Sequence, residues 1–185
     1  LERCRRAHET IAREDPPSHP QSLFPIVQGG MHADLRRASV EGILGIGAWD
    51  GIAIGGVSVG EPKPVIYDVI ATCDPLLPTD APRYVMGVGH PDDLVEGVAR
   101  GVDLFDCVAA TKLGRDGTAF TPDGSVQVRH SSFRTSTRPL LEGCSCPACT
   151  RFDRAYLRHL FNAREDYGPR LLAQHNLTML HTLMR

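Results

Sequence analysis

Four short apolar runs, each followed by a segment with helical spacing, constrain the fold of this chain most strongly. In the segment after the first run, Leu35, Ala38, Val40, Ile43 and Leu44 recur roughly as they would on one face of a helix. Repeated strand-then-helix units predict parallel strands joined by right-handed helical crossovers. The runs lie within residues 23–28, 50–56, 83–89 and 102–108.

Two architectures fit this alternation: an open doubly wound sheet, or part of an eight-stranded β/α barrel. No G-x-G-x-x-G opens a helix after a strand, so nothing favours a dinucleotide-binding sheet. A whole barrel needs about 250 residues, so four units correspond to half of one. The chain starts at Leu1 with a charged helical segment, and we expect it to be a fragment. In both architectures functional groups belong at the carboxyl ends of the strands.

Composition narrows the class of protein. The 185 residues are 42% hydrophobic and 23% charged, as in a globular domain with a real core. No apolar run approaches the roughly 18 residues of a membrane span, and the start lacks the apolar core of a signal peptide, so we expect a cytoplasmic protein. The net charge of −2 excludes a globally basic nucleic-acid-binding protein, so any such surface is local.

The strand-helix rhythm changes at about Thr111. Turn signals at Asp116-Gly117 and Asp123-Gly124 flank short alternating segments that predict antiparallel strands. Two helices are expected after them, over residues 151–166 and 169–185.

Three of the six cysteines, Cys144, Cys146 and Cys149, fall within six positions. In a reducing compartment such bunching favours a metal over a disulfide framework. Tetrahedral zinc needs a fourth ligand, for which His159, His175 and His181 are candidates. His175 lies on an apolar helical stripe, which fits a ligand and also an ordinary hydrogen-bonded core histidine; spacing favours it over His159. Four protein ligands would make one structural Zn²⁺ rather than a catalytic one.

Asp106 stands at the carboxyl end of the fourth run. A carboxylate there can act as a nucleophile at a sugar carbon or as a general base. The alternative is an aspartate that caps the following loop. Asp103 and Cys107 alternate to the other face, where we expect a structural aspartate and a small buried thiol.

The loop GIAIGGVSVGEPK is richer in glycine than an ordinary connection. Gly55 and Gly56 would let a flat group approach the backbone and take hydrogen bonds from its N–H groups, or they form a simple tight turn. Glu61 and Lys63 close this loop.

Seven blocks, in order, carry a family resemblance: LFPIVQGG, GIAIGGVSVGEPK, RYVMGVGHPDDL, GVDLFDCV, TKLGRDGTAFT, CSCPAC and HNL. Together they resemble the C-terminal half of the bacterial tRNA-guanine transglycosylases, from Leu23 to Arg185. The resemblance implies an α/β fold: the C-terminal half of an irregular (β/α)8 TIM barrel with an appended zinc-binding subdomain. Residues 1–110 would form the second half of the barrel, with its N-terminal half absent, and residues 111–185 the strands, the zinc subdomain and the C-terminal helices.

The resemblance also implies the chemistry, which is exchange of the guanine at the tRNA wobble position for a deazaguanine base, as in queuosine biosynthesis. Asp106 matches the nucleophile that forms a covalent intermediate with the ribose. Val59, where queuine-using eukaryotic members have glycine, points to the small precursor preQ1. The substrate-binding set is Gln28, Gly55, Gly56, Val59 and Glu61, and the zinc ligands are Cys144, Cys146, Cys149 and His175.

Two segments match those that contact tRNA, and the family commonly forms homodimers. Lys112 stands where arginine is more frequent in the family. Its ammonium group would contact a phosphate as a point charge, without the two parallel hydrogen bonds that a guanidinium can donate. The second catalytic aspartate of the family belongs to the amino half, so we expect residues 1–185 alone to be inactive. The alternative is a non-catalytic, zinc-containing tRNA-binding partner subunit. The RNA-binding set is Gly87, Val88, Gly89, His90, Pro91, Asp92, Asp93, Thr111, Lys112, Leu113, Gly114 and Arg115.

Overall fold

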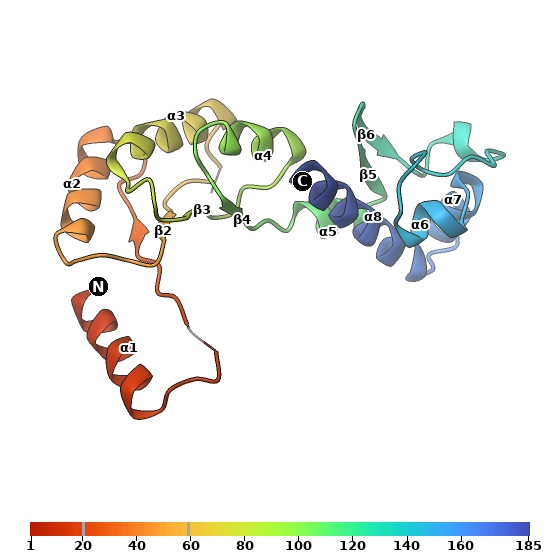
Figure 1. Cartoon of the computed structure of the whole chain (residues 1–185). Coiled ribbons are helices and arrows are strands. Elements are labelled where there is room, and N and C mark those ends of the chain that lie inside the picture. Colours follow the sequence, from red (N-terminus) through yellow and green to blue (C-terminus); the bar gives the residue numbers. More distant parts are fainter. Residues whose placement is uncertain (20, 59) are drawn as a thin grey trace. The chain divides into compact units, whose positions relative to one another are not determined.

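The computed structural model describes residues 1–19, 21–58 and 60–185, which form two compact units (Figure 1). Unit 1 consists of Leu1–Val88 and Asp92–Asp106, and unit 2 of Gly89–Pro91 and Cys107–Arg185. Each unit has a hydrophobic core of its own. Within the described residues, no helix combines the length and the apolar character that a membrane span requires.

Unit 1 is built on a parallel sheet with the strand order β1-β2-β3-β4, which confirms the predicted parallel strands. The strands are shorter than the apolar runs. In the first run Pro25 has no N–H to donate, and it contributes only its carbonyl, which accepts from Ala53 N. The strands are β1 (Ile26–Val27), β2 (Ile52–Ile54), β3 (Arg83–Val85) and β4 (Leu104–Phe105).

Helices α2 and α3 pack on the sheet of unit 1 through their apolar faces. Val40 and Ile43 from α2 join Ile66, Ile70 and the strand residues in one core. Figure 1 shows α3 and α4 on the same side of the strands. The helices are α1 (Glu2–Glu14), α2 (Ala33–Leu44), α3 (Lys63–Cys73), the short 3₁₀ helix η1 (Asp74–Leu76) and α4 (Pro91–Val98).

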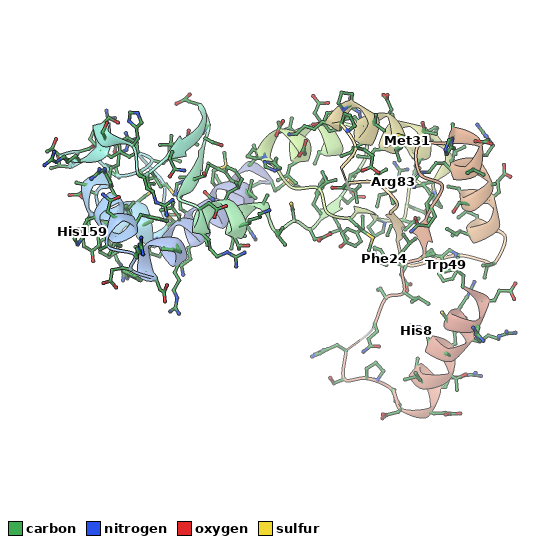
Figure 2. All side chains as sticks on the ribbon, turned by 180° about the vertical axis from the view of Figure 1, so that it is seen from behind. His8, Phe24, Met31, Trp49, Arg83 and His159 are labelled. Atoms are coloured by element: carbon green, nitrogen blue, oxygen red, sulfur yellow. The ribbon has the colours of Figure 1, made fainter. Side chains whose placement is uncertain are left out.

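Helix α1 is attached differently, because none of its residues is buried. The Arg5 guanidinium donates to Ile46 O at 3.0 Å and lies 5.3 Å from the ring centroid of Trp49. Figure 2 labels Trp49 and Phe24 on the part of unit 1 next to this helix. The predicted helical start is confirmed, and polar contacts rather than core burial hold it.

Unit 2 combines an antiparallel hairpin with four α-helices, within the part of the chain that the structure describes. The predicted hairpin is confirmed by pairs such as Ala119 with Val126. The helix expected over residues 151–166 is shorter, because Asp153 accepts from Tyr156 N at 2.7 Å and caps a helix that begins at Arg154. The elements are α5 (Ala109–Arg115), β5 (Thr118–Thr121), β6 (Gly124–Gln127), η2 (Ser131–Phe133), α6 (Pro147–Arg151), α7 (Arg154–Asn162) and α8 (Tyr167–Leu183).

Helix α8 organises unit 2 through one buried amide. Asn176 accepts from Phe120 N at 2.8 Å and donates to Ala110 O and Thr118 O, both at 3.0 Å. Helix α5 approaches α8 so closely that a Cβ on Gly114 would lie 2.7 Å from Ala173 N. Helices α5 and α8 and strand β5 therefore form one tightly connected body.

Candidate active site and metal centre

The carboxyl edge of the parallel sheet gathers the residues that the sequence singled out. Gln28 follows β1, Gly55 and Gly56 follow β2, and Asp106 follows β4. Gly87 lies two residues beyond the end of β3. Because all four strands run in the same direction, these residues stand at one edge of the sheet, in unit 1.

Asp106 is exposed and held at one of its two oxygens. Its Oδ1 accepts from the Tyr84 hydroxyl at 2.6 Å and from Gly87 N at 3.0 Å. The hydrogen bond to Asp106 raises the pKa of Tyr84, with a smaller contribution from burial, so the phenol remains a donor at neutral pH. Among the described residues no donor reaches Oδ2. The carboxylate is thus oriented, with one oxygen open to a reactant.

The neighbours of Asp106 serve the backbone. Asp103 Oδ2 accepts from Arg83 N at 2.8 Å, which confirms the structural role expected for it. Cys107 is half-buried, and its Sγ accepts from Ala109 N at 3.3 Å, so it contributes more than apolar packing.

The side chain of Gln28 lies over the two glycines that follow β2. A Cβ on Gly56 would lie 2.6 Å from Gln28 Oε1, and one on Gly55 would lie 3.0 Å from Gln28 Nε2. Gly56 also has φ +68°, a conformation that favours glycine. The positive φ fits the turn that the sequence offered as one alternative, and the approach of a flat ligand to the glycine N–H groups stays a prediction. The group that approaches the glycine backbone is the Gln28 amide.

Arg36 was missed by the sequence reading. The apolar spacing suggested Leu35 as an inward residue of α2, but Leu35 is 52% exposed and Arg36 is 0% exposed. The inward face is Arg36, Val40 and Ile43, which are spaced by four and then three residues. That spacing was visible in the sequence, but a charged residue was not expected on it. Burial lowers the pKa of Arg36, partly offset by the nearby Cys73.

The far end of the glycine-rich loop is anchored by charge. Lys63 Nζ lies 2.5 Å from Asp92 Oδ2 and 2.8 Å from Asp93 Oδ1. Asp93 also accepts from the Tyr67 hydroxyl at 2.6 Å. Burial, followed by this hydrogen bond, raises the pKa of Tyr67 to about 12. This cluster joins the starts of α3 and α4. Glu61, predicted to bind substrate, is half-buried, and Val59 lies outside the described residues.

The residues predicted to contact RNA differ in accessibility. Asp93 is buried in the Lys63 cluster and Gly114 in the contact between α5 and α8. Lys112 and Arg115 are exposed on α5. The others divide into exposed Gly87, His90 and Asp92, half-buried Pro91, Thr111 and Leu113, and buried Val88 and Gly89.

Unit 2 brings together the four predicted metal ligands. The ligand atoms of Cys144, Cys146, Cys149 and His175 all lie within 4.8 Å of one another. His175 Nδ1 lies 3.8, 3.4 and 3.4 Å from the three sulfurs, in that order. A tetrahedral zinc with bonds of about 2.1 to 2.3 Å separates its ligands by roughly 3.5 to 3.8 Å, so the cluster has the size of a metal site.

The hydrogen bonds around the cluster orient the His175 ring and favour a thiolate, and both features suit the binding of a cation. His175 Nε2 lies 2.9 Å from Phe120 O; with the proton on Nε2, the Nδ1 lone pair faces the sulfurs. A hydrogen bond from the Cys149 thiol lowers the pKa of Cys146 to about 4 and raises that of Cys149, so the pair shares a proton that a metal would displace. His159 and His181 are exposed and outside the cluster.

Comparisons with known proteins agree with this arrangement. The family model for queuine tRNA-ribosyltransferase matches residues 1–185. The chain is 52% identical to the queuine tRNA-ribosyltransferase of Symbiobacterium thermophilum over 98% of its length and 44% of that relative. It is 48% identical to that of Chromobacterium violaceum over 100% of its length and 48% of the relative. The chain therefore spans about half the length of these curated relatives, and it belongs to the queuine tRNA-ribosyltransferase family.

Proposed function

We propose that the natural protein containing this chain is a tRNA-guanine transglycosylase that inserts preQ1 at the wobble position, in queuosine biosynthesis. The observation that carries the proposal is the exposed carboxylate of Asp106, held by Tyr84 and Gly87 at the carboxyl end of β4. Family membership supports the reaction class.

The proposed reaction is a double displacement at the ribose anomeric carbon. Asp106 Oδ2 forms a bond to C1′ while the bond from C1′ to guanine N9 breaks. Guanine leaves with the electron pair and takes a proton from a general acid. The incoming base then loses its N9 proton, attacks C1′ and displaces the aspartate, so that two inversions retain configuration and regenerate the carboxylate. The acid and base role belongs to an aspartate in the amino half of the family's proteins.

Recognition of the base is assigned to Gln28, Gly55 and Gly56. The position of the Gln28 amide over the glycine backbone supports this assignment, because an incoming base would meet this amide and the Gly56 N–H together, while Gly55 N–H donates to Val27 O at 3.0 Å. We assign Val59 and Glu61 to the part of the pocket that accommodates the aminomethyl group of preQ1. Support for the two residues comes from the sequence pattern alone.

Contact with tRNA is assigned to residues 87–93 and 111–115. Exposed Lys112 and Arg115 suit phosphate groups, as a local cationic feature of a chain with net charge −2. The family resemblance further supports action as a cytoplasmic homodimer.

For the metal centre we propose one structural Zn²⁺ held by the three cysteines and His175. The soft donor set and the four-ligand closure support zinc over harder cations. The ion would stabilise unit 2, and no reaction step passes through it.

For unit 1 we propose half of an irregular β/α barrel, completed by an amino half. The exposed side chains of Ile26 and Leu104 on the sheet strands, 37% and 46% accessible, support a missing apolar partner. Since that half would also supply the second aspartate, residues 1–185 alone should not exchange guanine.

The decisive experiment traps the covalent intermediate. The full-length protein incubated with tRNA bearing guanine at the wobble position should give an adduct that survives denaturing electrophoresis, and the Asp106→Asn variant should bind tRNA without forming it. An adduct that persists in Asp106→Asn would disprove the nucleophile. A wild-type protein that binds tRNA but neither forms an adduct nor exchanges guanine would instead be a non-catalytic tRNA-binding partner.

A further inference from the structure

Arg36 carries a fully buried positive charge whose hydrogen bonds go to backbone carbonyls. None of the ion pairs between described residues includes it. Its four hydrogen bonds reach the carbonyls of Gly30, Val27, Gly55 and Gly56. Burying an ion without a counter-ion is costly, and an apolar side chain would fill the space without that cost. What the guanidinium adds is a fixed position and orientation for those four carbonyl groups.

Two of these carbonyls directly precede the residues assigned to the base. Arg36 Nη1 donates to Val27 O at 3.2 Å and to Gly55 O at 2.7 Å. In a planar trans peptide the C=O of one residue and the N–H of the next point in opposite directions. Fixing Val27 O and Gly55 O therefore also fixes the N–H groups of Gln28 and Gly56.

The N–H groups of these two peptide units differ in whether they have an acceptor. Gln28 N donates to Ser39 Oγ at 3.1 Å, so its peptide is held from both sides by α2. Gly56 N–H, in contrast, has no acceptor among the residues that the structure describes. It points away from the guanidinium. A cationic donor on the carbonyl side also polarises the peptide and makes its N–H a stronger donor.

From this geometry, and resting on the function proposed above, we propose that Arg36 is a positioning residue for base recognition. It fixes the backbone of Gln28, which carries the side-chain amide assigned to the base. It also orients the Gly56 N–H toward the space where a purine-like base would bind. Arg36 itself touches neither the base nor the tRNA. Its loss should therefore weaken binding of the base and leave tRNA binding intact.

The test is steady-state kinetics of the full-length enzyme with the Arg36→Lys variant, using guanine and preQ1 as the bases. One lysine nitrogen cannot reach four carbonyls, so KM for either base should rise about tenfold, while KM for tRNA stays within about twofold. The matched control is Arg83→Lys. Arg83, labelled in Figure 2, is also buried and donates to Leu77 O and Pro78 O, but it pairs with Asp74 as well and lies at the amino end of β3. Its substitution should lower the melting temperature and leave both KM values unchanged.

The outcomes separate positioning from folding. Activity of Arg36→Lys that falls only in proportion to its folded fraction, with KM for the base unchanged, would overturn the proposal. If Arg36→Lys does not fold, Ser39→Ala decides, because it frees the same Gln28 peptide: a raised KM for the base supports the proposal, and an unchanged one overturns it. A folded wild-type enzyme without guanine exchange would refute the proposed function itself, which is a different result from an active variant with unchanged KM.

Discussion

The sheet edge of unit 1 and the cysteine-histidine cluster of unit 2 both gather polar residues, yet in opposite ways. At the edge, Asp106, Gln28 and Gly56 are exposed, and Asp106 Oδ2 and Gly56 N–H have no partner among the described residues. In the cluster, His175 is 0% exposed and both its nitrogens are engaged. Unused hydrogen-bonding capacity is what a substrate site needs, whereas a saturated, buried donor set suits a structural ion.

The largest expected effect comes from removing the nucleophile at the exposed edge. Asp106→Asn keeps the shape and the acceptor for Tyr84 but not the negative charge. Exchange of radiolabelled guanine into tRNA should fall by about 10⁴-fold. Asp103→Asn is the control, because its carboxamide oxygen can still accept from Arg83 N. Asp103 lies before β4, at the opposite end of the strand, so comparable losses in both variants would mean that the loss does not depend on the place of Asp106 at the carboxyl edge.

Breaking the closed cluster should instead cost stability. Cys146→Ser should remove the bound metal and destabilise unit 2 by on the order of 3 kcal/mol or more. Hydrogen exchange followed by mass spectrometry should show lost protection over residues 144–183, with residues 26–106 little changed. Cys4→Ser, at an exposed cysteine, is the control. One equivalent of metal retained by Cys146→Ser would contradict the assigned ligand set.

A smaller effect on kcat is expected from Tyr84, whose hydroxyl donates a hydrogen bond to the proposed nucleophile. Tyr84→Phe removes one of the two donors to Asp106 Oδ1 and leaves Gly87 N in place. A lost hydrogen bond of about 1 kcal/mol corresponds to a roughly fivefold lower kcat. The melting temperature should hardly change, since Tyr84 is half-buried. An unaltered kcat would show that Gly87 N suffices to orient the carboxylate.

The smallest effect concerns the cationic residues of α5. Lys112→Met and Arg115→Met should each reduce the slope of log tRNA affinity against log salt by about one. Arg37→Met, on the exposed side of α2, should leave that slope as it is. A slope that does not respond to either α5 substitution would exclude phosphate contacts there.

The elements could be predicted from sequence because their signals are local. Short apolar runs followed by helical spacing marked the strands, and the bunched cysteines with an inward His175 marked the metal cluster. Asp106 stood out because chain direction places strand ends at one edge. The contacts that could not be predicted join residues that lie far apart in the sequence. Nothing local tells that Asp92 and Asp93 pair with Lys63, or that Tyr84 supports Asp106.

Arg36 shows why hydrophobic spacing alone is incomplete. Its four partners are backbone carbonyls, which every residue possesses and no sequence pattern marks. A helix face that contains a charged residue can therefore point inward, provided that backbone carbonyls at the strand ends accept hydrogen bonds from that residue. The inward spacing with Val40 and Ile43 was the available signal.

The adjacency of His175 and Asn176 on α8 has a thermodynamic consequence. The histidine joins the metal cluster, and the amide of its neighbour holds Ala110 O at the start of α5, the helix that carries Lys112 and Arg115. If ion binding orders this body for tRNA, the coupling free energy must act equally in reverse. Bound tRNA would then slow the loss of the ion to a chelator.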